Sequence, residues 1–134
     1  MAEQAPAADL ESATWWEALR RHRVVLQRCD AHGHLRFPPM PTCPYCGSRG
    51  HTEVEVSGRG RVHAMVRVHR ALTPAMAGEV PYAVATVQLD EGPRLVARVE
   101  ESGDAVAIDD VVRPCFVDHD GWTELRFAPA ESPR

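Results

Sequence analysis

From residue 52 onward, apolar and polar positions alternate with a period of two, which predicts strands that turn one face to a core. A first short run occupies residues 52–56. The polar, glycine-containing segment 57–60 follows, and a longer alternation then runs through residues 61–69. In this longer run we expect four positions to share the core face: Val62, Ala64, Val66 and Val68.

Four further strands are expected after an irregular loop at 71–79, and an acidic connection at 100–110 separates them into two pairs. The strands are expected at residues 81–90, 94–99, 111–117 and 122–127, with turns at 91–93 and 118–121. Pro114 cannot donate a ladder hydrogen bond, so its strand should have a free edge or a bulge there. Five short, closely spaced strands predict a small closed barrel of the OB type.

A short helix is expected before the strands, at residues 15–22. The sequence Thr14-Trp15-Trp16-Glu17 has the pattern of a capping box, with Thr14 as the N-cap. Two adjacent tryptophans cannot occupy one narrow helical stripe, so one is expected to pack on this domain and the other on a partner. Alternatively, both cover the domain's own core. Residues 1–14 are polar and lack the pattern of a signal peptide, which favours a flexible tail on a cytoplasmic protein.

Between the helix and the strands lie two matching candidate metal knuckles. They are Cys29-x-x-His32-Gly33 and Cys43-x-x-Cys46-Gly47, in a loop rich in proline and glycine. Cys29, His32, Cys43 and Cys46 would form a closed tetrahedral Cys₃His site, which is typical of structural zinc. His34 is an alternative fourth ligand, and a metal-free ribbon is a further alternative. Cys115 is distant in sequence and is predicted to be a small packing residue.

Charge is unevenly distributed along the chain, whose net charge is −4. Residues 15–70 carry ten Arg against four acidic residues, whereas residues 71–134 carry five Arg against twelve. The first segment could therefore meet an anion and the second a basic surface, although solvated surface charge explains the pattern equally well. A candidate site for the phosphates of an anionic ligand lies on or beside one polar face of the strand at 61–69: Arg59, Arg61, Arg67, His69 and Arg70. A merely solvated strand face is the alternative.

Taken together, several stretches resemble the zinc-ribbon plus OB-fold proteins known as domain of unknown function 35. The matching stretches are WWEALRRHRVVLQRC, RFPPMPTCPYCGS, VSGRGRV, VPYAVATVQLDEGPRLVARV and FAPA. In two places the sequence departs from the family pattern, which usually has Cys where this chain has His32 and Gly where it has Asp109. The resemblance implies a mainly β protein with a flexible tail at 1–14, a helix plus rubredoxin-like ribbon at 15–56 and an OB barrel at 57–130.

The resemblance also implies a noncatalytic accessory subunit. Such proteins accompany thiolase-fold acyltransferases, steroid side-chain aldolases and hydratases that act on acyl-CoA, and they are thought to dock on the enzyme and help to hold CoA. Together with the residue patterns above, this role predicts a structural zinc ion, a heterotetramer with the enzyme's own dimer, CoA contacts from the arginine cluster and partner contacts from Trp15 and Trp16. A single-stranded nucleic-acid-binding module is the alternative, but the net negative charge and the scarcity of aromatic residues at strand positions disfavour it. An independent enzyme is also disfavoured, because no catalytic motif is recognisable.

Overall fold

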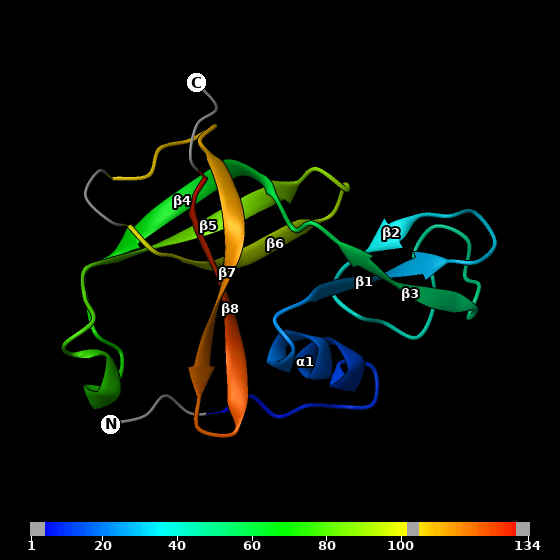
Figure 1. Cartoon of the computed structure of the whole chain (residues 1–134), viewed down its shortest axis with the longest axis horizontal. Coiled ribbons are helices and arrows are strands. Elements are labelled where there is room, and N and C mark those ends of the chain that lie inside the picture. Colours follow the sequence, from blue (N-terminus) through cyan, green and yellow to red (C-terminus); the bar gives the residue numbers. More distant parts are fainter. Residues whose placement is uncertain (1–4, 102–104, 131–134) are drawn as a thin grey trace.

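The structure, a computed structural model, describes residues 5–101 and 105–130. Figure 1 shows a helix beside two β assemblies. The helix is α1 (Ala13–Arg20), and the small sheet has the order β2-β1-β3, with β1 (Val24–Cys29), β2 (Leu35–Arg36) and β3 (His51–Val56). The second assembly is a closed barrel of order β4-β5-β6-β8-β7. It comprises β4 (Gly60–Val68), β5 (Tyr82–Leu89), β6 (Arg94–Val99), β7 (Val111–His119) and β8 (Trp122–Pro129), with the short helix η1 (Pro74–Met76) between β4 and β5. The expected mainly β architecture of helix, ribbon and five-stranded barrel is confirmed.

Two short seams close the barrel. β4 pairs with β7 only at Gly60↔Val112 and Arg61↔Val111, and β6 meets β8 in parallel at the single pair Val99↔Phe127. Gly60, at the first seam, also lets β4 lie close against β5, because a Cβ at this position would collide with the carbonyl oxygen of Gln88 on β5. Between residues 94 and 98, β6 therefore pairs with β5 on one side only, and α1 lies near this gap (Figure 1).

The core is built from the inward faces of the barrel strands and from one side of α1. Phe127, Val62 and Val87 are completely buried, and Leu19 of α1 is 1% exposed. Trp15 is 7% exposed, and its ring lies 4.7 Å from that of Phe37 in the ribbon. The helix thus joins the barrel core to the ribbon, which ties the two β assemblies into one hydrophobic unit.

The helix begins earlier than the capping-box pattern predicted. Ser12, not Thr14, is its N-cap residue, and Thr14 lies within the first turn. Asp9 and Ser12 bond to one another: the Asp9 amide donates to Ser12 Oγ at 3.0 Å, and the Ser12 amide donates to Asp9 Oδ1 at 2.7 Å. This reciprocal pair starts the turn three residues upstream, so the prediction of Thr14 as the cap was wrong.

The alternation predicted along β4 is broken by a register shift between Val62 and Ala64. Val62 is completely buried, but after the shift Met65 and Arg67 stand opposite the buried residues Ala85 and Ala83 of β5. A β-bulge adds one residue to a strand, and a one-residue slip moves every later side chain to the opposite face. The prediction that Ala64, Val66 and Val68 share the core face with Val62 was therefore wrong.

The connection into β7 contains a non-glycine residue in the left-handed region. Asp109 has φ 76°, and its amide donates to the carbonyl oxygen of Val62 at 2.8 Å. Aspartate tolerates this conformation better than most residues, which explains how the turn forms where the family usually has glycine. Pro114 lies on β7 beyond the two pairs with β4, where β7 pairs with β8 alone, so the predicted strand edge at this proline is confirmed.

Candidate functional site

The two cysteine-containing segments form knuckles of the same geometry. In the first, the Gly33 amide donates to the Cys29 carbonyl at 2.7 Å, and in the second the Gly47 amide donates to the Cys43 carbonyl at 2.8 Å. Gly33 and Gly47 have φ values of 76° and 75°, a conformation that glycine adopts at little cost. The paired glycines therefore turn the chain so that both segments direct side chains toward one point.

Three cysteine sulfurs meet at that point. Within the described residues, Cys29, Cys43 and Cys46 form a group whose ligand atoms all lie within 4.8 Å of one another. The sulfurs of Cys29 and Cys46 are 3.6 Å apart. A tetrahedral zinc ion with Zn–S bonds of about 2.3 Å would separate its sulfurs by roughly 3.8 Å, so the donor set and its spacing fit zinc.

The ionisation of these thiols also favours a bound cation. Burial raises the pKa of the Cys43 thiol, but hydrogen bonds from the backbone amides of Tyr45 and Cys46 and from the neighbouring thiols outweigh burial and bring that pKa to about 7. The pKa of Cys46 is raised: the Ser48 amide lowers it, but burial and the sulfurs of Cys29 and Cys43 raise it more. One thiolate therefore suppresses ionisation of the next, and a divalent cation would remove that repulsion.

Neither His32 nor His34 belongs to the three-cysteine group. The two histidine rings lie 5.8 Å apart, and the His34 ring lies 4.8 Å from that of the exposed Tyr45. His32 lies three residues after Cys29 and directly before Gly33, the position that Cys46 has in the second knuckle, which supports it as the fourth ligand. That assignment stays a prediction.

The five basic residues predicted to form one phosphate site lie at the two ends of β4. Arg59 and Arg61 are at its start, whereas Arg67, His69 and Arg70 are at its end, roughly 20 Å along an extended strand. The shift at 62–64 also places Arg61 and Arg67 on opposite faces. They do not form a single cluster, so the expectation of one shared polar face was wrong.

Arg67 is already paired. Its two terminal nitrogens donate to the carboxylate of Glu101 at 2.7 and 2.8 Å. These bonds, opposed by burial, lower the pKa of Glu101 to about 2. Arg61 donates to the carbonyl oxygen of Asp109 at 3.1 Å and remains exposed, as does Arg59.

The two adjacent tryptophans have different environments. Trp15 belongs to the core, whereas Trp16 is half-buried, and its ring lies 6.1 Å from that of Trp122 in an edge-to-face arrangement. Trp122 also stacks on His119, with ring centroids 4.4 Å apart. The sequence did not single out Trp122, although its position directly after the turn at 120–121 places it at the end of the barrel.

These rings line a groove of about 310 Å³ between α1 and the gap in the barrel, which we term the tryptophan groove. Its lining is mostly apolar, and β6 contributes one side of it. The lining residues are Trp15, Trp16, Leu19, Phe37, Leu95, Val96, Ala97, Arg98, Trp122, Glu124 and Leu125.

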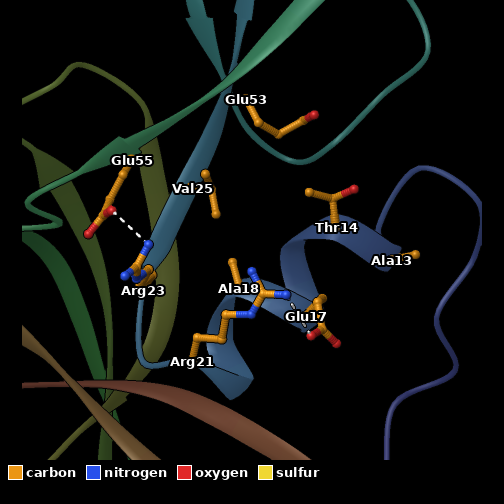
Figure 2. A pocket seen from close by; sticks show the side chains of 9 residues that line it. All are labelled: Ala13, Thr14, Glu17, Ala18, Arg21, Arg23, Val25, Glu53 and Glu55. Atoms are coloured by element: carbon orange, nitrogen blue, oxygen red, sulfur yellow. Dashed lines mark hydrogen bonds and ion pairs between the residues drawn. The ribbon is translucent and has the colours of Figure 1, made fainter.

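A second hollow, of about 540 Å³, lies between α1 and strands β1 and β3 of the ribbon (Figure 2). Four of its five charged groups pair with one another: Arg21 lies 3.3 Å from Glu17, and Arg23 lies 3.6 Å from Glu55. Its nine lining residues include no cysteine or histidine. This hollow is a polar seam between helix and ribbon.

Cys115 is half-buried on β7, and burial, reinforced by the negative charge of Glu100, raises the pKa of its thiol. A raised pKa disfavours the thiolate, which is the reactive form. This environment fits the predicted packing residue rather than a nucleophile. In the part of the chain that is described, no helix is long and apolar enough to cross a membrane.

Two adjoining family matches cover most of the chain. Residues 16–52 match the family described as "ChsH2, rubredoxin-like zinc ribbon domain", and residues 53–117 match "ChsH2, C-terminal OB-fold domain". The zinc-ribbon match and the three-cysteine cluster together support a structural zinc ion. Both also agree with the order of ribbon and barrel in the structure.

Individual relatives include enzyme subunits and scaffold proteins. The chain is 45% identical over 94 residues to a "probable enoyl-CoA hydratase alpha subunit" of Thermomonospora curvata, covering 70% of this chain but only 29% of that protein. It is 36% identical over 95 residues to a "DUF35 domain-containing scaffold protein" of Pyrococcus furiosus, covering 69% of this chain and 67% of the relative. Among solved structures, it is similar to a chain of the "Ltp2-ChsH2(DUF35) aldolase", with a TM-score of 0.85, 39% identity and coverage of 95% of this chain and 100% of that chain. The chain therefore belongs to the ChsH2-type DUF35 family of zinc-ribbon and OB-fold proteins.

Proposed function

We propose that this protein is a noncatalytic accessory subunit that docks on an enzyme acting on acyl-CoA thioesters, either a thiolase-fold acyltransferase or aldolase or a hydratase. One observation carries the proposal: the chain matches the whole of a ChsH2(DUF35) chain solved within an aldolase, at 39% identity. Relatives named as a scaffold and as a hydratase alpha subunit support the same role. The accessory subunit would stabilise the enzyme or help to hold its substrate.

Within this role, the ribbon has a structural function. The three cysteines would hold zinc together with His32, and the chain's residues fix this geometry through the two glycine turns. Zinc, when bound, cross-links the loop at 29–47 to the end of β1 and so stabilises the sheet that carries α1.

CoA contacts would come from the start of β4. Arg59 and Arg61 are exposed and lie near one another in sequence, so they can approach the phosphates of a CoA held at the enzyme interface. Arg67 is committed to Glu101, and we assign it to the fold rather than to the ligand. His69 and Arg70 would reach a different part of the complex.

Partner contact would include Trp16. A half-buried tryptophan beside an apolar groove has the character of an interface anchor. Trp15 is buried and would act indirectly, by fixing the position of α1. A heterotetramer of two accessory chains on an enzyme dimer would follow from the two-fold symmetry of such dimers.

The test is reconstitution with the Ltp2 aldolase subunit and with a thiolase-fold or hydratase subunit from the same organism as this chain. Light scattering after gel filtration gives the mass of the complex, and activity is compared for the enzyme subunit alone, this chain alone and the mixture. We expect a stable complex whose activity exceeds that of the enzyme subunit alone, with no turnover by this chain. Turnover of an acyl-CoA by this chain alone would contradict the noncatalytic role, and absence of any complex would contradict docking.

A further inference from the structure

The outer face of the barrel sheet carries a contiguous apolar surface. After the register shift in β4, Val66 points outward and is 61% exposed. It stands directly opposite Val84 of β5, and Val96 of β6, 67% exposed, lies diagonally beside Val84. With Ala64 these residues form what we term the valine face. Solitary exposed valines are ordinary, but adjacent ones on three neighbouring strands are typical of an interaction site.

The valine face continues into the tryptophan groove. Val96 lines the groove and also lines a shallow hollow that includes Ala64, Val66 and Val84. The apolar surface therefore runs from Trp16 and Trp122 around the edge of β6 onto the outer face of the sheet. In the same stretch, residues 94–98 of β6 pair with β5 on one side only. A partner could thus contact both side chains and the strand edge.

The strand positions of this surface carry positive charge, and the one carboxylate that lines the groove, Glu124, is paired with Arg126 and His119. Among the outward positions of the described strands β4, β5 and β6, the charged residues are Arg61, Arg94 and Arg98, and none is acidic. Arg98 lies over the Tyr82 ring at 4.6 Å. Its Nη1 is 3.0 Å from Glu79 Oε1, at an angle that leaves this nitrogen without a hydrogen bond. A basic rim around an apolar centre complements an apolar surface bordered by carboxylates.

We infer that the valine face and the tryptophan groove form one docking surface, occupied by an apolar segment of the enzyme subunit that is flanked by Asp or Glu side chains. This inference rests on the proposed function for the identity of the partner. It places the centre of the interface at Val96, where groove and sheet face meet, rather than on α1 alone.

Val96→Glu tests the inference, because it adds a charge to the centre of the surface at an exposed position where folding tolerates it. Val96→Thr retains the β-branched shape and serves as the mild variant, and Leu10→Glu is the matched control. Leu10 is 89% exposed and does not line the groove. Binding to the Ltp2 aldolase subunit is measured by titration calorimetry, and each variant's melting temperature is measured without partner.

We expect Val96→Glu to raise the Kd at least tenfold and Val96→Thr to raise it less, while Leu10→Glu changes it less than twofold. Arg98→Glu should also weaken binding. In the complex, amide hydrogen exchange should slow within residues 94–98. Melting temperatures of the free Val96 variants should remain close to that of the wild type.

These outcomes distinguish an error in the docking surface from an error in the proposed accessory function. If the wild-type chain binds and Val96→Glu binds equally well, the docking surface is wrong while the accessory role stands. If the wild-type chain does not bind the enzyme subunit, the proposed function fails, and the assigned occupant fails with it. If the isolated chain is a dimer that Val96→Glu separates, the occupant is a second copy of this chain, which also overturns the inference.

Discussion

Replacing Trp15 by Ala should destabilise the free protein strongly, because Trp15 connects the helix to the ribbon. Its side chain is 7% exposed and packs on Phe37 at a ring distance of 4.7 Å. Burial of about 200 Å² of tryptophan surface at about 25 cal/mol per Å² corresponds to about 5 kcal/mol, and measured core Trp→Ala changes cost roughly 3–5 kcal/mol. For a domain of this size, that corresponds to a fall in melting temperature of roughly 10–20 °C.

Trp16→Ala is the control against which the stability loss of Trp15→Ala is compared. Trp16 is half-buried and retains one edge-to-face contact, with Trp122. We expect it to cost about 1–2 kcal/mol in the free chain, most of which is the ring contact and partial burial. Thermal melts followed by circular dichroism measure both variants, with Trp15→Phe as an intermediate that keeps a ring against Phe37. A melting temperature for Trp15→Ala as high as that for Trp16→Ala would refute the core assignment of Trp15.

Three further predictions concern the metal, a turn and an ion pair. Elemental analysis of protein purified without chelator should find about one zinc per chain, and His32→Ala should weaken zinc binding while His34→Ala should not. Asp109→Gly should raise the free energy of unfolding by about 1 kcal/mol and Asp109→Ala should lower it, because φ at this position is 76°. Glu101 has a pKa of about 2 in the folded protein against 4.5 when unperturbed, so its contribution to stability is present above pH 4.5 and is lost as pH falls through about 2. Urea titrations should therefore show that Glu101→Gln lowers stability at pH 6, with a difference from the wild type that shrinks as the pH is lowered toward 2.

The metal knuckles could be predicted from the sequence because their geometry is local. Three or four residues fix each turn, and the glycines Gly33 and Gly47 mark where the backbone becomes left-handed. The same holds for β6, whose predicted bounds of 94–99 agree with the structure, because clear turn residues precede it. The identity of the fourth ligand could not be predicted in this way. It depends on the side-chain rotamer of His32, which spacing alone does not determine.

The start of the helix shows how two valid local signals can compete. Thr14 and Glu17 have the spacing of a capping box, but Asp9 and Ser12 have the same spacing five residues earlier. The structure uses the upstream pair, which bonds reciprocally and lets the helix begin at Ala13. The helix is eight residues long in both cases, at 13–20 instead of the predicted 15–22, so the upstream pair shifts the helix without lengthening it.

The bulge in β4 could not be predicted from the sequence. It accounts both for the main error in the predicted fold and for the proposed docking surface. Uninterrupted alternation from Val62 would turn Val66 to the core face and Arg67 to the outer face beside Arg61. The shift between Val62 and Ala64 moves the side chains of Val66 and Arg67 to the opposite faces of the sheet. The register with β5 is set by pairing across strands and not by the pattern within one strand. Arg67 is then held by Glu101 instead of remaining available to a phosphate, and Val66 joins Val84 and Val96 on the outer face. Ala64 and Val66, which alternation assigned to the core, thus belong to the surface that we propose for docking.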